Sequence, residues 1–372
     1  MKSENISEFL QTRIGAKDFP SAVYLVAERG SVIFQDALGC AVVEPEKIEA
    51  KIDTIYDLAS LTKPLVTGLL GAKLIERGEI NLEDKISKFF AEFDTDEKRE
   101  ITIVNLLTHT SGFPAWRPFY LIQGSRCEIQ NSIASEPLEN LPKARVVYSD
   151  FNFLLLGFLL EKLYGESLDR IAQNEIFAPL KLENTFFNPP KKLQKRIAAS
   201  ENGNEYEKQM CVELGFEFRI PNSEFRTQIV WGEVHDGNSY FMNGVAGHAG
   251  LFSDAFGVFK IAQQFLAEET VLLKPETCKL FRANYTKGLN EARSMAFQLA
   301  ATKDSTASEA LAKDSFGHLG FTGTSLWIEP ETERICILLT NRTHARELPF
   351  ANINAVRRRF HELASSDLKM RD

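Results

Sequence analysis

The sequence predicts an α+β fold in which one antiparallel sheet, built from both ends of the chain, is flanked by helices. Strand-like runs gather near the start and in the last part of the chain, and the stretch between them carries mostly helical patterns separated by long loops rich in Pro, Gly and Asn. Strands at both ends are most simply joined in one sheet. We therefore expect a sheet domain from residues 1–65 and 290–372, and a mostly helical inserted domain from 66–289.

The first part of the chain opens with a short amphipathic helix that we expect to end near residue 16. Two strand-like runs follow, at 22–28 and 31–38, and the Arg-Gly pair between them predicts a hairpin. A further strand-like piece at 54–56 leads directly into Ser60, where the pattern changes.

Two helices are expected next. The first begins at Ser60 and repeats apolar residues on one face as far as Leu74. Pro64 falls in its first turn, where a missing amide is tolerated, and Gly78 predicts its C-terminal cap. The second is the most apolar stretch of the chain, 151–160, which is too short to span a bilayer and is expected to be buried.

The last part of the chain returns to strand patterns at 295–300, 320–328 and 335–340. A helix at 352–363 is expected to close the chain. The densest basic run, 357–359, lies in this helix, and we interpret it as a solvated face.

Composition and charge narrow the class of function. The 372 residues carry a formal net charge of −8 with both signs spread along the chain, which gives no electrostatic footprint for nucleic acid. The N-terminus lacks the apolar core of a signal peptide, so we expect a cytoplasmic protein without a membrane span. The sequence does not indicate an oligomeric state.

The cysteines are odd in number, lie far apart and form no CxxC pair. This spacing indicates neither a zinc ribbon nor a disulfide framework. We expect free thiols in a reducing compartment. The five are Cys40, Cys127, Cys211, Cys278 and Cys336.

Ser60 and Lys63 form a Ser-x-x-Lys pattern at the predicted helix start, which places both side chains on one face. A serine hydroxyl becomes a nucleophile when a neighbour takes its proton, and a lysine in a partly dry pocket can do this or can hold a nearby base anionic. The pattern alone is weak, because a second copy begins at Ser366 and looks accidental. Taken alone, the first copy is better explained as an N-cap serine beside a solvated lysine.

A second segment, Tyr148-Ser149-Asp150, lies just before the apolar helix. Either Ser149 or Asp150 could cap that helix. Alternatively, the Tyr148 hydroxyl lies beside Ser60 and acts as a phenolate-like base. From this segment alone, the two interpretations are about equally supported.

The third segment begins His318-Leu319-Gly320-Phe321. Two other His-x-Gly triplets, at 235 and 248, show that the triplet itself says little. Only the His318 copy starts a strand-like run in the C-terminal sheet region, where an edge strand can offer backbone groups to an extended substrate and Gly320 permits close approach.

The three segments together resemble the branch of the serine β-lactamase and penicillin-binding-protein superfamily that includes class C β-lactamases, class C-type D-Ala-D-Ala carboxypeptidases and family VIII carboxylesterases. Further segments in the family's order extend the resemblance over nearly the whole chain, at 77–85, 106–112, 184–187 and 245–253.

The resemblance implies acyl transfer. Ser60 would attack an ester, amide or lactam carbonyl with help from Lys63 and Tyr148, and water would release the acyl group. The oxyanion would be held by the backbone amides of Ser60 and Phe321. His318 would orient substrate or tune Tyr148, or would simply be a neutral strand histidine.

Two departures from the family pattern bear on the substrate. Asp150 stands where the family often has Asn, and a carboxylate accepts hydrogen bonds but does not donate them. His318 and Leu319 replace Lys and Thr, which removes contacts expected for a substrate carboxylate. Both changes lower the expectation of efficient β-lactamase activity.

The leading hypothesis is therefore a serine hydrolase that cleaves small carboxylic esters through an acyl-enzyme at Ser60. A D-Ala-type peptide or β-lactam hydrolase is the second hypothesis, and a binding or sensor module that acylates with slow turnover is the third. No metal or cofactor is expected, because His235 and His248 lack a His-Glu-x-x-His frame and no nucleotide motif is present. A Gly-x-Ser-x-Gly elbow is also absent.

Overall fold

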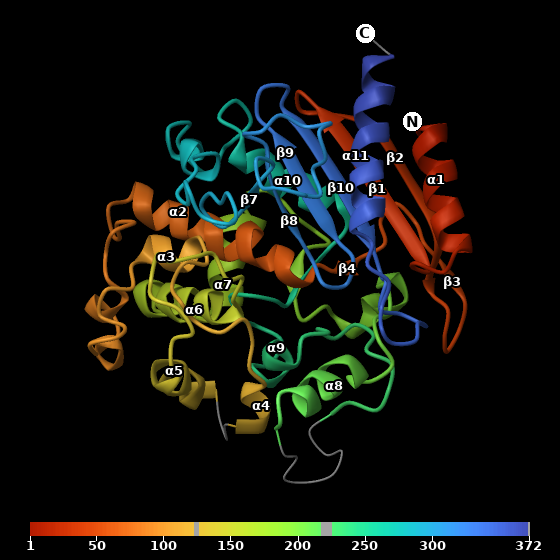
Figure 1. The fold of residues 1–372 in the computed structure, drawn as a ribbon. Coiled ribbons are helices and arrows are strands. Elements are labelled where there is room, and N and C mark those ends of the chain that lie inside the picture. Colours follow the sequence, from red (N-terminus) through yellow and green to blue (C-terminus); the bar gives the residue numbers. More distant parts are fainter. Residues whose placement is uncertain (123–125, 217–224, 371–372) are drawn as a thin grey trace.

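A computed structural model describes residues 1–122, 126–216 and 225–370. Within these residues the main feature is a seven-stranded antiparallel sheet of order β3-β2-β1-β10-β9-β8-β7 (Figure 1). Strands from the two chain ends meet where β1 pairs with β10, which confirms the predicted fold class. The strands are β1 (Ser21–Glu28), β2 (Ser31–Val42), β3 (Ile48–Glu49), β7 (Gln298–Leu299), β8 (Phe316–Leu319), β9 (Ser325–Glu329) and β10 (Arg334–Thr340).

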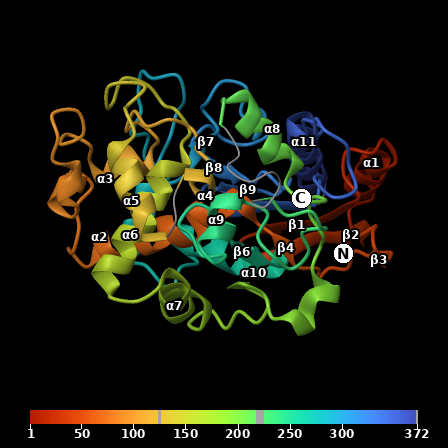
Figure 2. The same ribbon diagram turned by 90° about the horizontal axis from the view of Figure 1, so that it is seen from below.

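The central strands are apolar on both faces because helices cover both faces of the sheet (Figure 2). On β1, Tyr24 and Val26 pack with helices α1 (Glu4–Gly15) and α11 (Asn354–Lys369). The alternate residues Val23 and Leu25 belong to the larger core on the opposite face, where helix α10 (Ala255–Ala262) lies. Side chains alternate along a strand, so a fully apolar run is what a strand buried on both faces requires.

The larger core also contains residues of the helical region, among them Phe151 and Leu155 from α6 (Asp150–Tyr164). One continuous core thus joins the sheet and the helical region. The expected division into two domains at residues 65 and 290 stays a prediction. The remaining helices are α2 (Leu69–Glu76), α3 (Ile103–Leu107), α4 (Phe119–Ile122), α5 (Arg126–Ser135), α7 (Leu168–Ala172), α8 (Glu205–Glu213) and α9 (Gly237–Phe241).

The predicted strand at 320–328 is wrong in extent. The chain reverses between β8 and β9, so His318 lies on one strand and residues 325–328 lie on the next. Gly323 permits the reversal, because its φ is +110° and an added Cβ would lie 1.9 Å from Thr340 Oγ1. The predicted strand at 295–300 shrinks to β7, with Ala296 at a positive φ just before it.

The single helix predicted from Ser60 is also corrected. Ser60 lies in a short 3₁₀ turn, η1 (Ala59–Leu61), which is followed by a π-helical segment, η2 (Lys63–Gly68), and only then by α2. Such irregular helical segments are frequent at functional sites. The end of the helix is as predicted, since Gly78 has a φ of +73° just beyond α2.

A second, three-stranded sheet fixes the chain that enters this turn. Its order is β4 (Tyr56–Asp57), β6 (Leu251–Ser253) and β5 (Phe186–Phe187). The Leu58 N–H also donates to Leu251 O at 2.9 Å. Segments more than a hundred residues apart in the sequence thereby hold the backbone just before Ser60.

Two further expectations meet the structure here. Cys40, Cys211, Cys278 and Cys336 are free thiols, and the Cys127 side chain lies outside the described residues. Among the helices that the structure describes, none has the length and apolar character needed to cross a membrane. The cytoplasmic location stays a prediction.

Candidate active site

The backbone around Ser60 is held in an unusual shape. Ala59 has a φ of +47°, a value that non-glycine residues rarely adopt. Its N–H donates to Asp57 Oδ1 at 2.8 Å, and its carbonyl accepts from the Thr62 hydroxyl at 2.7 Å. Strained backbone fixed by its surroundings is typical of functional sites. Ser60 itself is partly exposed and lines two cavities, one on each side.

Lys63 is fully buried directly behind this serine. Its Nζ donates to Ser60 Oγ at 3.0 Å and to His248 O at 3.2 Å, and it lies 2.7 Å from Asp150 Oδ1. The interpretation of Lys63 as a solvated lysine beside a cap is therefore wrong. Burial alone would lower the pKa of Lys63, but Asp150 and Tyr148 outweigh it and raise that pKa above its ordinary value.

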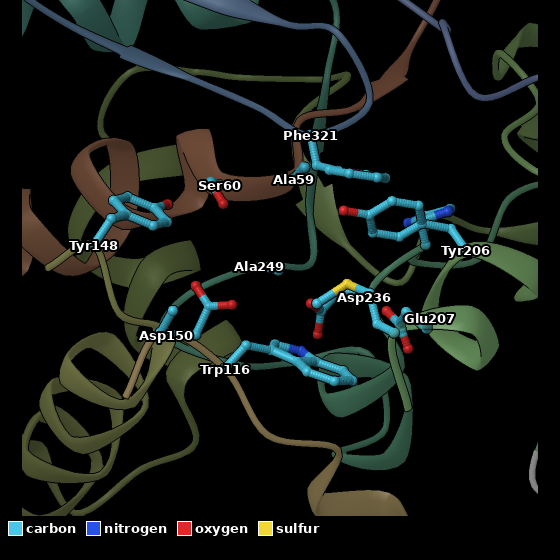
Figure 3. Close-up of a pocket in the computed structure, with 13 residues that line it drawn as sticks. Ala59, Ser60, Trp116, Tyr148, Asp150, Tyr206, Glu207, Asp236, Ala249 and Phe321 are labelled. Carbon is cyan, nitrogen blue, oxygen red and sulfur yellow. The ribbon is translucent and has the colours of Figure 1, made fainter. Parts of the chain in front are cut away.

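Tyr148 lies beside Ser60, as Figure 3 shows. Its hydroxyl is buried and has no hydrogen-bond partner within the described residues, while Lys63 Nζ lies 4.9 Å from the ring centroid. Burial raises the pKa of Tyr148 more than the nearby Lys63 lowers it. The resting side chain is therefore a phenol and not a phenolate at neutral pH.

His109 holds the segment that carries Tyr148. Its ring stacks on the Tyr148 ring with centroids 4.5 Å apart, and its Nδ1 accepts from the Ser149 N–H at 3.1 Å. The His109 carbonyl also accepts from the Val147 N–H at 2.9 Å. Burial and the nearby cations lower the pKa of His109 well below its usual value, so the ring is neutral.

The cap interpretation of the same segment fails for both residues that it named. Ser149 occupies the N-cap position of α6, but its hydroxyl donates to Pro114 O at 2.6 Å and caps nothing. Asp150 opens the helix, and its Oδ1 lies 2.7 Å from Lys63 Nζ. Asp150 thus belongs to the same cluster as Ser60, Lys63 and Tyr148.

The third segment closes the site from the sheet. His318 is buried, its Nδ1 bonds to Leu319 O at 3.0 Å, and its Nε2 has no partner among the described residues. Burial lowers its pKa well below the usual value, which gives the neutral histidine considered from the sequence. An added Cβ at Gly320 would lie 2.0 Å from Thr324 Oγ1 and 2.6 Å from Leu58 O, so only glycine fits there. Phe321 follows and lines both cavities beside Ser60.

One of the two cavities, which we call the acidic lobe, has a volume of about 290 Å³. Asp150, Glu207 and Asp236 contribute carboxylates to its wall, and Trp116 and Met210 contribute apolar surface (Figure 3). Glu207 is buried and is bonded by neutral donors, the Gly237 N–H at 2.8 Å and the Tyr120 hydroxyl at 2.8 Å.

Although these two donors favour the carboxylate form, Glu207 resists ionisation. Burial, reinforced by the neighbouring Asp236, raises the pKa of Glu207 to about 7. Asp236 behaves in the opposite way: although burial raises its pKa, the bonded His248 holds that pKa well below the ordinary value.

The other cavity, which we call the arginine lobe, has a volume of about 300 Å³ and adjoins Ser60 on the sheet side. Arg293, Arg342 and Arg357 line it together with His318. Arg293 is paired with Glu291, whereas Arg342 and Arg357 have no carboxylate partner within the described part of the chain. This lobe therefore presents uncompensated positive charge next to the nucleophile.

Arg357 overturns the interpretation of the basic run 357–359 as a solvated face. Its side chain is only 5% exposed and donates to Gly320 O and Thr324 O, each at 3.0 Å. Burial, together with the charge of Arg342, lowers the pKa of Arg357. The helix phase that buries Val356 and Phe360 turns Arg357 inward as well.

The sequence motifs identify the site residues of the three segments. They do not identify the residues that only tertiary contacts bring to the site. Glu207 and Asp236 in the acidic lobe, and Arg293 and Arg342 in the arginine lobe, lie in segments without a recognised motif. The triplet at 235 was dismissed as chance, yet its Asp236 faces the cavity. No local pattern signalled these residues.

Asp150, Asp236 and His248 place ligand-type atoms within 4.8 Å of one another, as a metal site would. However, Asp150 is paired with Lys63, and His248 Nε2 bonds to Asp236 Oδ1 at 2.9 Å. The Lys63 ammonium already supplies positive charge beside this group, so we do not assign these residues as metal ligands.

Comparison with known proteins agrees with this geometry. The β-lactamase family model matches residues 5–358, which is nearly the whole chain. The chain belongs to the β-lactamase family. A relative from Escherichia coli K12, named "Putative D-alanyl-D-alanine carboxypeptidase", is 32% identical over 355 residues, which cover 88% of this chain and 79% of the relative. The chain is therefore a serine hydrolase of the β-lactamase fold.

Solved structures share this fold at low sequence identity. A class C β-lactamase superposes with a TM-score of 0.74 at 14% identity, covering 98% of this chain and 96% of the other. EstCE1, described as a hydrolase with promiscuous acyltransferase activity, gives a TM-score of 0.72 at 20% identity, with 96% and 98% covered. These two structures support the fold and leave the substrate open.

Proposed function

We propose that the protein cleaves small peptides or esters that carry a carboxylate near the scissile bond, through an acyl-enzyme at Ser60. The observation that carries the proposal is the arginine lobe, where Arg342 and Arg357 lie beside Ser60 and have no carboxylate partner among the described residues. Guanidinium groups bind carboxylates through charge-assisted hydrogen bonds. A peptide ending in D-alanine, as the name of the Escherichia coli relative suggests, has such a carboxylate next to its scissile amide.

The arginine lobe could also supply the positive charge that is lost where His318 and Leu319 replace the Lys and Thr of the family pattern. His318 is neutral, so it does not replace the positive charge of a lysine. Arg342 and Arg357 place positive charge in the same cavity that His318 and Leu319 line. We therefore infer that anion recognition persists at this position with different residues.

The chemical step follows from the positions of three side chains. Ser60 Oγ attacks the carbonyl carbon as its O–H bond breaks, and the proton passes to Tyr148 Oη. Tyr148 gives its own proton to the leaving nitrogen or oxygen as the bond to that atom breaks, so it remains a phenol throughout. The raised pKa of Tyr148 supports this relay over a phenolate base. The backbone amides of Ser60 and Phe321 would stabilise the oxyanion.

A second candidate is the hydrolysis of small neutral carboxylic esters, the leading hypothesis from the sequence. The apolar wall formed by Trp116, Met210 and Phe321 favours it, because it suits an uncharged acyl group. This activity requires nothing from the arginine lobe.

The test is a substrate panel measured on one preparation: p-nitrophenyl acetate and butyrate, nitrocefin, and acylated D-Ala-D-Ala peptides. We expect the D-Ala peptides to give the highest kcat/KM. Turnover of the neutral esters alone would contradict the proposal and favour the second candidate. A burst of one product equivalent followed by arrest, with every substrate, would instead indicate an acylating sensor.

A further inference from the structure

The surroundings of Lys63 Nζ match an ammonium and not a neutral amine. Three oxygen atoms surround it: Ser60 Oγ at 3.0 Å and His248 O at 3.2 Å accept its hydrogen bonds, and Asp150 Oδ1 forms an ion pair with it at 2.7 Å. An ammonium has a positive charge, three N–H groups and no lone pair, so it suits both hydrogen bonds and the ion pair. A neutral amine has two N–H groups, and its lone pair would have to face one of these oxygens or the serine proton.

Asp150 is the group that decides between the two forms. Lys63 is completely buried, and a buried lysine without a counter-charge tends to lose its proton. Among the described residues, Asp150 is the one carboxylate paired with Lys63 Nζ. An asparagine, which the family often has at this position, would keep the shape and remove the charge.

At neutral pH, the other ionisable groups around Lys63 do not supply a negative charge paired with its Nζ. Tyr148, from the segment before α6, is a neutral phenol because burial raises its pKa. His109 after α3 and His318 on β8 are neutral, because burial lowers the pKa of each well below its usual value. Arg293, before β7, is paired with Glu291, and Asp236 is bonded to His248. Among the described residues, neither Arg293 nor Asp236 forms an ion pair or a hydrogen bond with Lys63 Nζ.

We propose that Asp150 is a positioning residue that keeps Lys63 in the ammonium form, so that Lys63 acts as a hydrogen-bond donor to Ser60 Oγ and not as the base that deprotonates it. This inference rests on the proposed acyl-enzyme chemistry at Ser60. The ammonium stabilises negative charge that develops on Ser60 Oγ during attack, while the serine proton leaves through Tyr148. Lys63 and Asp150 keep their charges throughout the step, so proton balance is met by Tyr148 and the leaving group alone.

The first test is the pH dependence of acylation by p-nitrophenyl acetate in wild type and in Asp150→Asn. In wild type we expect no change of kcat/KM caused by titration of Lys63 between about pH 6 and pH 9. In Asp150→Asn, Lys63 loses its counter-charge and titrates inside this range, and kcat/KM should fall about tenfold per pH unit above the new pKa. A kcat/KM that rises with pH in this variant would show that neutral Lys63 is the base and would overturn the proposal.

Two variants separate charge from structure. Asp150→Glu keeps the carboxylate, and we expect it to keep the wild-type pH profile even if its rate is lower. Asp169→Asn removes the same charge from the first turn of another helix, α7, and Asp169 is not among the residues bonded to or paired with Lys63 Nζ in the described structure. Its profile should match wild type. A new limb in Asp150→Glu would contradict the assignment of the effect to charge.

The second test needs no turnover. The ¹³Cε shift of Lys63, assigned in ¹³C-lysine-labelled protein by its loss in Lys63→Met, reports the protonation state directly. We expect no titration below about pH 9 in wild type and a titration there in Asp150→Asn. A wild-type Lys63 that titrates below pH 9 would overturn this inference, whereas failure of every substrate in the kinetic panel would contradict only the proposed function.

Discussion

The two lobes beside Ser60 differ in the ionisable side chains that line them and in whether those side chains have partners. The acidic lobe carries Asp150, Glu207 and Asp236, whereas the arginine lobe carries Arg342 and Arg357 without carboxylate partners within the described residues. In the acidic lobe, Asp150 is paired with Lys63, Asp236 is bonded to His248 and the pKa of Glu207 is raised to about 7. The comparison teaches that the uncompensated charge beside Ser60 lies in the arginine lobe, which is where the proposed function places the carboxylate of the substrate.

The largest effect should come from the residue at the boundary of the lobes. Tyr148 lines both cavities, and in the relay it moves a proton from Ser60 on to the leaving group. We expect Tyr148→Phe to lower kcat by a factor of roughly a hundred or more for every substrate, with the measurement made at saturating substrate. Near-wild-type turnover would remove Tyr148 from the relay.

The next effect should separate the lobes by substrate charge. Arg342→Gln should raise KM about tenfold or more for a D-Ala-D-Ala peptide, because one charge-assisted hydrogen bond to the carboxylate is lost. The same variant should leave KM for p-nitrophenyl acetate near wild type. Arg346→Gln is the matched control, since Arg346 lies four residues on and does not line the arginine lobe. Equal losses on charged and neutral substrates would argue against anion recognition.

Glu207 in the acidic lobe should make the free energy of unfolding depend on pH. The pKa of Glu207 is raised from 4.5 to about 7, so between these values the folded state binds more protons than the unfolded state. The contribution of Glu207 to the free energy of unfolding therefore falls as pH rises through this window. We expect Glu207→Gln to be more stable relative to wild type at pH 8 than at pH 5, by on the order of 1 to 3 kcal/mol.

Urea unfolding at the two pH values measures this difference. A difference between Glu207→Gln and wild type that does not change with pH would show that Glu207 ionises normally in the fold.

The smallest expected effect is that of salt concentration on KM, which compares the two lobes without a mutation. Raising the salt concentration screens the arginine lobe, so KM for a carboxylate-bearing substrate should rise a few-fold between about 0.05 M and 0.5 M salt. KM for a neutral ester should stay constant. A parallel rise for both substrates would indicate a general salt effect on the protein.

The residues that sequence reasoning identified are those carried by short segments. Ser60 and Lys63 are three residues apart, so a helical turn brings them together whatever the rest of the fold does. Tyr148 and His318 became candidates through the order of their segments along the chain. The fold class was predictable because the apolar strands at both ends had to find partners, and β1 does pair with β10.

The residues that were missed depend on tertiary contacts. Glu207 lies on α8 and Arg342 follows β10, and neither has a local partner that reveals its position. Arg357 was the exception, because Ile353, Val356, Phe360 and Ala364 mark a buried face that passes through position 357. Arg357 was nevertheless taken as exposed, because it belongs to a run of three arginines.

The strand at 320–328 was predicted too long, because the residues that include Gly320 and Gly323 were taken as one strand with the apolar run that follows them. The reversal is fixed by contacts that the run itself does not contain, namely Thr340 against Gly323 and Leu58 against Gly320. The helix from Ser60 was misjudged for a related reason, since Asp57 holds Ala59 in a conformation that a regular helix would not allow.

The central claim is that Ser60 becomes acylated, and intact-protein mass spectrometry tests it most directly. After brief exposure to a D-Ala-D-Ala peptide or a β-lactam, followed by acid quenching, the account predicts a mass increase equal to one acyl group. Peptide mapping should place that group on Ser60, and Ser60→Ala should not acquire it. An adduct that persists in Ser60→Ala, or that maps to another residue, would contradict the account.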